Sequence, residues 1–156
     1  MKRISLLLLF TIVTRLFFCQ ESSAVQFIEN KGQFDEKIDF KLTLNAGNVY
    51  FEGNCITYNF FEKGKISKIR HGDTTLNPEI KSHAYKTHFI ESNLDCINVG
   101  KSSNSNFYNY FIGNDSSKWA TNVNSYNRIE YFNIYDSIDI AFYRKKEHLK
   151  YDFIVN

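Results

Sequence analysis

The sequence predicts an all-β fold, an antiparallel β-sandwich-like domain with at most one short helical turn. Phe and Tyr supply 25 of the 156 residues and Asn supplies 17. Aromatic side chains favour strands, and Asn favours tight turns. Several short stretches alternate apolar with polar residues, which is the period of a strand with one buried face. No stretch has a long apolar stripe at helical spacing. Such strands bury their apolar faces by layering antiparallel sheets.

The first predicted strands form a meander. Residues 38–44 alternate apolar and polar side chains, and the turn sequence "NAGN" follows at 45–48. A second strand begins at Val49, the turn sequence "EGN" follows at 52–54, and residues 56–60 alternate again. This pattern predicts three antiparallel strands with one apolar face.

Further strands are predicted towards the end of the chain. Residues 83–90 alternate, with Tyr85 on the apolar side. Residues 138–143 and 149–155 also alternate, and the charged segment 144–148 connects them. The last two segments therefore predict a β-hairpin.

The region between these strands is richer in turn residues. The Ser- and Asn-rich segment 100–106 predicts a loop. Phe107–Ile112 is apolar on both faces, which is typical of a central strand. Residues 115–120 predict one turn of helix with Asp115 or Ser116 as its N-cap.

The N-terminus predicts a secretory signal peptide over residues 1–24. A basic start precedes an apolar run that Arg15 interrupts. A bilayer-spanning helix takes roughly 20 apolar residues, so this run is too short and broken to span. Ser22 and Ala24 form the small-x-small pattern that signal peptidase requires, which predicts cleavage after Ala24.

Two processing alternatives remain open, cleavage after Ala24 or lipidation at Cys19. Phe18 is bulky where a lipoprotein signal has a small residue, which favours cleavage. The remainder, residues 25–156, is then a single all-β domain. Because its last predicted strand runs to Asn156, we expect the domain to be truncated at its C-terminal end.

The charge balance gives no reason to expect a nucleic-acid partner. The predicted signal peptide holds three of the 19 Lys and Arg residues and one of the 17 Asp and Glu residues, which leaves 16 of each. The apparent basicity of the chain therefore belongs to the targeting segment, and the mature part is neutral.

No catalytic, metal-binding or cofactor-binding motif is found in the sequence. His83 and His88 are five residues apart, so on a strand they face opposite sides and do not share one metal. Serine-hydrolase, Cys–His and phosphate-binding glycine motifs are also missing. We therefore expect a protein that is not an enzyme and that binds no cofactor and no metal.

Two cysteines, Cys55 and Cys96, lie outside the predicted signal peptide. In an oxidising compartment they either pair as a disulfide or remain two small buried apolar residues. Their spacing in the sequence does not distinguish the two, because a disulfide needs close Cα atoms.

An aromatic group is the best candidate for a ligand platform. It consists of Tyr108, Tyr110, Trp119 and Tyr126. Exposed rings of this kind bind sugars, but aromatics in an all-β domain also pack in the core. In the second interpretation, Trp119 folds back to cover one end of the core.

Four stretches that occur in one order resemble a known family. They are "FIENKGQFDEKIDFKL" (27–42), "HAYKTHFI" (83–90), "YNYFIGNDSSKWATNV" (108–123) and "SIDIAFYRKKEHLKYDFIV" (137–155). Together they are similar to an N-terminal domain of unknown function on secreted Bacteroidota proteins. The resemblance covers essentially the whole predicted mature chain.

The resemblance implies an exported module at the outer cell surface or outside the cell, with the periplasm as the alternative for a truncated chain. Proteins of this kind continue into SBBP β-propeller-type repeats and PKD or other Ig-like modules, and many end in a gliding-motility-associated or type IX secretion domain. The implied partners are those downstream β-repeat domains, which the 156 residues do not include, and a cell-surface polysaccharide or protein. The resemblance supplies no catalytic residues.

The expected function is that of a non-catalytic structural or adhesive module. The alternative is a module that binds carbohydrate or another surface polymer through exposed Tyr and Trp. A third interpretation is a hydrolase fragment whose active site lies on absent domains.

Overall fold

The computed structural model describes residues 26–62, 64–65, 68, 79–94, 96–145 and 148–156. Within these ranges one antiparallel sheet of nine strands has the order β5-β4-β3-β2-β1-β7-β8-β9, and β6 pairs with β7 off this path. The strands are β1 (Phe27–Glu29), β2 (Ile38–Leu44), β3 (Gly47–Glu52), β4 (Cys55–Phe61), β5 (Ser82–His88), β6 (Ile97–Tyr110), β7 (Ala120–Tyr135), β8 (Ile138–Lys145) and β9 (His148–Val155). One 3-10 turn, η1 (Ser116–Lys118), precedes β7.

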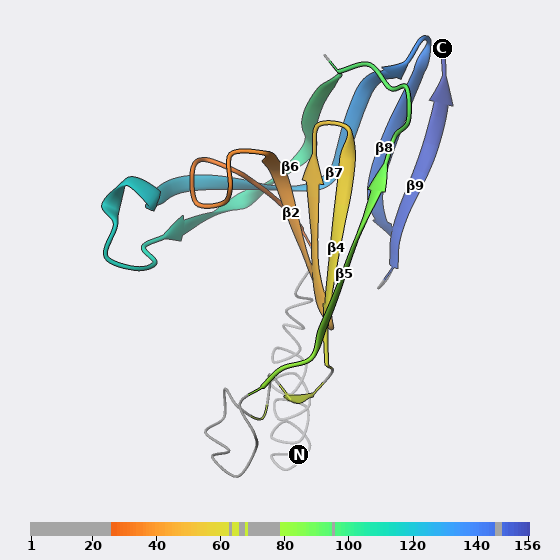
Figure 1. The fold of residues 1–156 in the computed structure, drawn as a ribbon. Helices are drawn as coiled ribbons and strands as arrows, with labels where there is room; N and C mark the ends of the chain where they lie inside the picture. The colour runs from red at the N-terminus through yellow and green to blue at the C-terminus, as the bar shows by residue number, and fades with distance from the viewer. Residues whose placement is uncertain (1–25, 63, 66–67, 69–78, 95, 146–147) are drawn as a thin grey trace, which may run out of the picture.

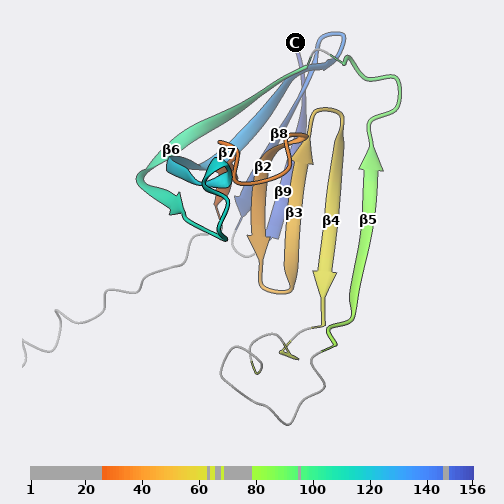
Figure 2. The ribbon, with the colours of Figure 1, turned by 60° about the vertical axis from the view of Figure 1, so that its left-hand side comes forward.

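The sheet divides into two walls at β7. Tyr126 pairs with Phe27 of β1 on one side and with β6 on the other. Three residues later, Ile129 pairs with Phe142 of β8 and again with β6. Strands β1 and β8 therefore share one edge of β7 and diverge from it. Strands β2 to β5 form one wall, and β8 and β9 form the other (Figures 1 and 2). The all-β prediction is confirmed, and its two layers belong to one curled sheet.

The core lies between the walls and is built on aromatic contacts. The ring of Phe51 on β3 meets Phe27 of β1 at 5.4 Å and Phe142 of β8 at 5.2 Å, both edge to face. Tyr131 of β7 is fully buried beside Phe142, and its hydroxyl donates to the Glu52 carbonyl at 3.1 Å. Burying one such side chain contributes about 1.5–3 kcal/mol to the stability of the fold, so these rings stabilise the packing of the two walls.

The predicted meander and hairpin are confirmed. Leu44 pairs with Gly47 and Glu52 pairs with Cys55, so each turn of the meander has two residues in its loop. Strands β8 and β9 form the predicted C-terminal hairpin. The predicted helical turn is η1, where the Asp115 side chain accepts the Ser117 N–H as an N-cap.

Two predictions for residues 100–112 are wrong. The predicted loop at 100–106 lies within β6, because pairing with β7 outweighs the low strand propensity of Ser, Asn and Gly. The segment Phe107–Ile112 is not a central strand. Its first part ends β6 and pairs only with β7 in a hairpin arm that projects from the sheet (Figure 1). Phe107, Phe111 and Ile112 are exposed there.

Candidate functional site

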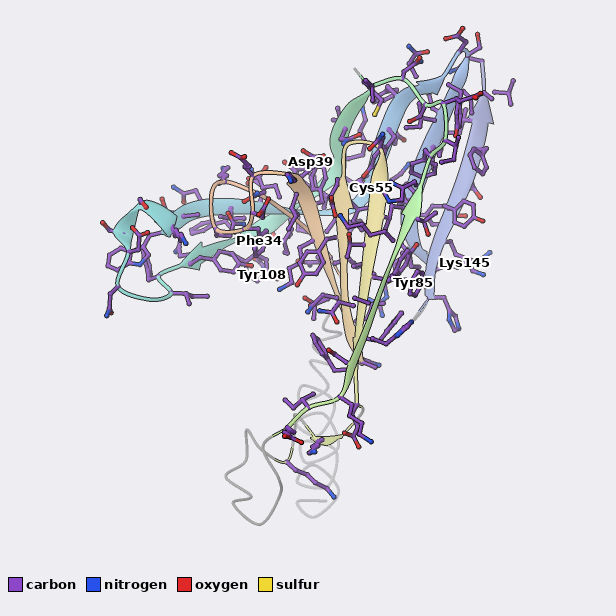
Figure 3. All side chains as sticks on the ribbon, viewed as in Figure 1. Phe34, Asp39, Cys55, Tyr85, Tyr108 and Lys145 are labelled. Atoms are coloured by element: carbon purple, nitrogen blue, oxygen red, sulfur yellow. The ribbon has the colours of Figure 1, made fainter. Side chains whose placement is uncertain are left out.

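A groove opens where the β4–β5 wall faces the β8–β9 wall. Its cavity volume is about 280 Å³. Figure 3 shows Tyr85 of β5 in front of the β8–β9 wall. The lining side chains are aromatic or aliphatic apart from one Thr, namely Ile56, Tyr58, Thr87, Phe89, Ile140, Phe142, Tyr151 and Phe153. None of these side chains is charged.

Strand periodicity places these side chains on the inner faces. Across the first wall, Tyr58 pairs with Tyr85, and across the second, Phe142 pairs with Tyr151. Successive residues of a strand point to opposite faces, so the neighbouring polar residues, such as Lys86, face outward.

Two tyrosine rings stack on each other on the inner face of the β4–β5 wall. The Tyr58 and Tyr85 rings are stacked, with centroids 4.8 Å apart and an interplanar angle of 13°. Burial raises the pKa of the Tyr58 hydroxyl, and the nearby Tyr85 and Tyr151 raise it further. The Tyr58 phenol therefore stays protonated at neutral pH and offers both a hydrogen-bond donor and an acceptor in the groove.

The aromatic side chains at the rim of the groove are more exposed to solvent than is usual for aromatic residues. Tyr85, Tyr151 and Phe153 retain 46%, 60% and 55% of their accessible surface. The rings of Tyr151 and Phe153 meet edge to face at 5.8 Å. Contiguous exposed apolar surface of this kind is typical of a binding surface.

A polar cluster is built around the β3–β4 turn. The Glu52 carboxylate accepts from the Thr57 hydroxyl at 2.5 Å and from Lys86 at 2.9 Å, and the Cys55 thiol lies 3.3 Å away. Burial alone raises the pKa of Glu52, but these donors outweigh burial and hold the pKa below its ordinary value. Burial and Glu52 raise the pKa of the Cys55 thiol.

Cys55 and Cys96, the two cysteines of the possible disulfide, both lie near this turn. Cys55 begins β4, and the Cys96 sulfur lies 3.3 Å from the Gly53 carbonyl. In the structure both are thiols. The two residues lie at the same end of the sheet, and a disulfide between them stays one of the two alternatives that the sequence leaves open.

The structure does not bring the four predicted platform residues together. Tyr126 is half-buried, its ring meets Phe40 at 5.9 Å, and its hydroxyl donates to Glu29 at 3.0 Å. Tyr110 packs edge to face on Phe34 at 5.8 Å.

The other two platform residues lie on the hairpin arm and its tip. The Tyr108 hydroxyl donates to the Gln26 side chain at 3.0 Å. Trp119 is 44% exposed. It therefore does not cover one end of the core, contrary to the second interpretation of the sequence. Its ring meets Phe111 at 5.6 Å, and its indole N–H donates to the Gly113 carbonyl at 3.3 Å. The physical reason is that the arm extends beyond the two walls.

The groove as a site is not predicted from the sequence. The residues that line the groove lie on strands that were predicted correctly. Which of these strands face each other, however, depends on the division of the sheet at β7. The usable signal was the concentration of Tyr and Phe on one side of residues 56–60, 83–90 and 149–155.

The histidines are dispersed. His83 and His88 pair with Phe60 and Cys55, so they lie on opposite faces of β5 as predicted, and His71 lies outside the described residues. In the described ranges, no three His, Cys, Asp or Glu side chains lie close enough to hold a metal ion.

Comparison with known proteins identifies the domain. The family model "Domain of unknown function (DUF7948)" matches residues 27–156. No curated protein and no solved structure matches the chain. The expected domain of unknown function is confirmed at this level. Over the residues that the structure covers, no helix has the length and apolarity needed to cross a bilayer.

Proposed function

We propose that this chain, which belongs to the family described as Domain of unknown function (DUF7948), is a non-catalytic β-domain that acts as a structural or adhesive module of an exported protein. The observation that carries the proposal is the groove, whose lining is aromatic and aliphatic and uncharged. The charged residues Lys86, Asp139 and Lys150 lie on the opposite faces of the same strands. Such a surface suits the docking of an apolar partner surface.

The proposal includes export and a wider protein context. The sequence of residues 1–24 supports a signal peptide and placement at the cell surface or outside the cell. The resemblance supports a Bacteroidota protein of the kind that carries SBBP repeats and type IX secretion domains. Mass spectrometry of the protein from its own host tests export, with a mature N-terminus at Val25 expected. Intact protein retained in the cytoplasm would contradict it.

Adhesion through the groove is tested with labelled purified chain and cells of the organism that produces it. We expect saturable binding that protease treatment of the cells abolishes, because the proposed partner is a protein. Tyr85→Ala is expected to weaken binding at least about fivefold, since an exposed aromatic residue stacked on the lining residue Tyr58 offers a contact of about 1 kcal/mol or more. Trp119→Ala, an equally exposed aromatic residue on the arm, is the matched control. Equal effects of both variants would contradict a role of the groove.

A second candidate function, carbohydrate binding, is favoured by the stacked pair of Tyr58 and Tyr85. Aromatic faces with nearby hydroxyl groups offer both an apolar surface and hydrogen bonds to a sugar ring. The site proposed for a sugar is therefore the groove, in place of the group of Tyr108, Tyr110, Trp119 and Tyr126.

Periodate oxidation of the cells separates the two functions. It destroys glycans and leaves most proteins in place, so binding that periodate removes and protease spares indicates a carbohydrate partner. A glycan array then identifies the sugar. Tyr85→Phe is expected to keep the ring contact but lose the hydroxyl, and it should weaken sugar binding more than protein binding.

A further inference from the structure

The outer edge of β9 is an open strand edge. β9 is the last strand in the sheet order, so among the described residues no strand pairs with its outer edge. On its inner face, Tyr151, Phe153 and Val155 are 60%, 55% and 77% exposed. Unpaired backbone groups beside apolar side chains recruit a further strand. We propose that β9 is a dimerisation strand and that its partner is β9 of a second copy of this chain.

The backbone of β9 is oriented for this pairing. The Asn156 N–H donates to the Ser137 carbonyl at 2.9 Å, in the same register that pairs Val155 with Ile138. In an antiparallel ladder, alternate residues turn both backbone groups towards the same neighbour. Asp152 therefore turns its N–H and C=O towards β8, and Tyr151 turns its own outward.

Charge complementarity selects one register. When two copies of β9 run antiparallel about Tyr151, each Tyr151 lies opposite its own copy in a hydrogen-bonded pair. Each Lys150 then lies opposite Asp152 of the second copy, in the non-hydrogen-bonded type of pair where side chains are closest. Both charged residues face outward and lie two positions apart on β9, with Tyr151 between them. The dimer thus contains two equivalent Lys–Asp pairs.

The neighbouring registers place like charges together. A shift of two residues in one direction puts Lys150 opposite Lys150, and a shift in the other direction puts Asp152 opposite Asp152. A shift of one residue would mismatch the outward backbone groups and exchange the inner and outer faces. The pattern of β9 therefore favours a single closed two-fold arrangement.

The other open strand edges, those of β5 and β6, lack this property, and β6 carries Lys101 but no Asp or Glu. Strand β5 carries Lys86, His83 and His88 but no Asp or Glu. Two copies of β5 have no carboxylate with which to complement these groups. The open edges of the sheet thus differ in their capacity for self-association.

Sedimentation velocity of the purified chain over increasing concentration tests the proposal. We expect a monomer–dimer equilibrium. Lys150→Asp and Asp152→Lys, each alone, place like charges opposite each other at two positions, so each should weaken the dimer about tenfold or more. An equimolar mixture of the two variants restores opposite charges at both positions and should dimerise. Lys81→Asp, which reverses an exposed charge beside β5, is the control and should dimerise normally.

A double variant tests the proposed register of the dimer. Lys150→Asp combined with Asp152→Lys in one chain exchanges the charges and should restore the homodimer. Far-ultraviolet circular dichroism of every variant confirms that the fold is retained. A chain that stays monomeric at every concentration would overturn the proposal, as would dimers indifferent to these charges, a mixture that fails to recover, or open assemblies larger than dimers.

Discussion

At the scale of single residues, Glu29 holds β1 to the beginning of β7. Its carboxylate accepts from the Asn124 backbone N–H at 2.7 Å and the Tyr126 hydroxyl at 3.0 Å, and Lys31 lies at 3.0 Å. Burial raises the pKa of Glu29, but the Asn124, Lys31 and Tyr126 contacts outweigh burial and hold it below its ordinary value. Tyr126 is therefore a structural partner of Glu29, and this pairing across distant segments cannot be read from local sequence.

Glu29→Gln tests the linkage to pH. Because the folded pKa of Glu29 is lowered, its stabilising effect is present above the unfolded pKa of about 4.3 and is lost as pH falls through the folded value. We expect the variant to lose about 1–2 kcal/mol of unfolding free energy at pH 7 and less at pH 3. Urea unfolding at the two pH values measures this. Glu36→Gln, on an exposed turn, is the control, and an equal loss at both pH values would contradict the linkage.

At the scale of elements, the β3–β4 hairpin depends on a close backbone approach at Gly47. An added Cβ there would lie inside contact distance of the Asn59 carbonyl and 2.9 Å from the Phe60 Cα. The sequence predicted a turn at 45–48 from its Asn and Gly content, but β3 already begins at Gly47. Gly47 allows β3 and β4 to pair closely, because the backbone of β4 fills the space that a side chain at this position would occupy.

Gly47→Ala is expected to destabilise the domain by about 1–3 kcal/mol, because the backbone of β4 must shift to admit the methyl group. Gly53→Ala in the next turn is the matched control, since nothing lies within 4 Å of a Cβ at that position. Thermal unfolding followed by circular dichroism compares the two. Similar melting temperatures for both variants would show that the hairpin adapts without cost.

At the scale of the whole molecule, Phe51 joins the two walls through Phe27 and Phe142. The hairpin arm contributes little to this core, because Trp119 and Phe111 at its tip are exposed and contact each other. The stability of the molecule should therefore depend on Phe51 far more than on the chain's single Trp.

Phe51→Ala should cost about 3–5 kcal/mol, and Trp119→Ala should cost less than about 1 kcal/mol. Urea unfolding monitored by far-ultraviolet circular dichroism measures both without relying on indole fluorescence. If the walls unfold as one unit, the near-ultraviolet signal of Phe51→Ala changes at the same urea concentration as the far-ultraviolet signal. A larger loss for Trp119→Ala would mean that the arm packs on the core.

The amino-acid sequence by itself determined the all-β class, the meander through β4, the Asp115-capped turn and the C-terminal hairpin. These features follow from alternation and turn residues that act between near neighbours in the chain. Only the tertiary structure decided that β6 and β7 form a long arm, that Tyr126 supports Glu29, and that Tyr58 and Tyr151 line one groove. Those outcomes depend on which distant strands share the edge of β7, and a local pattern carries no information about the pairing partner of a strand.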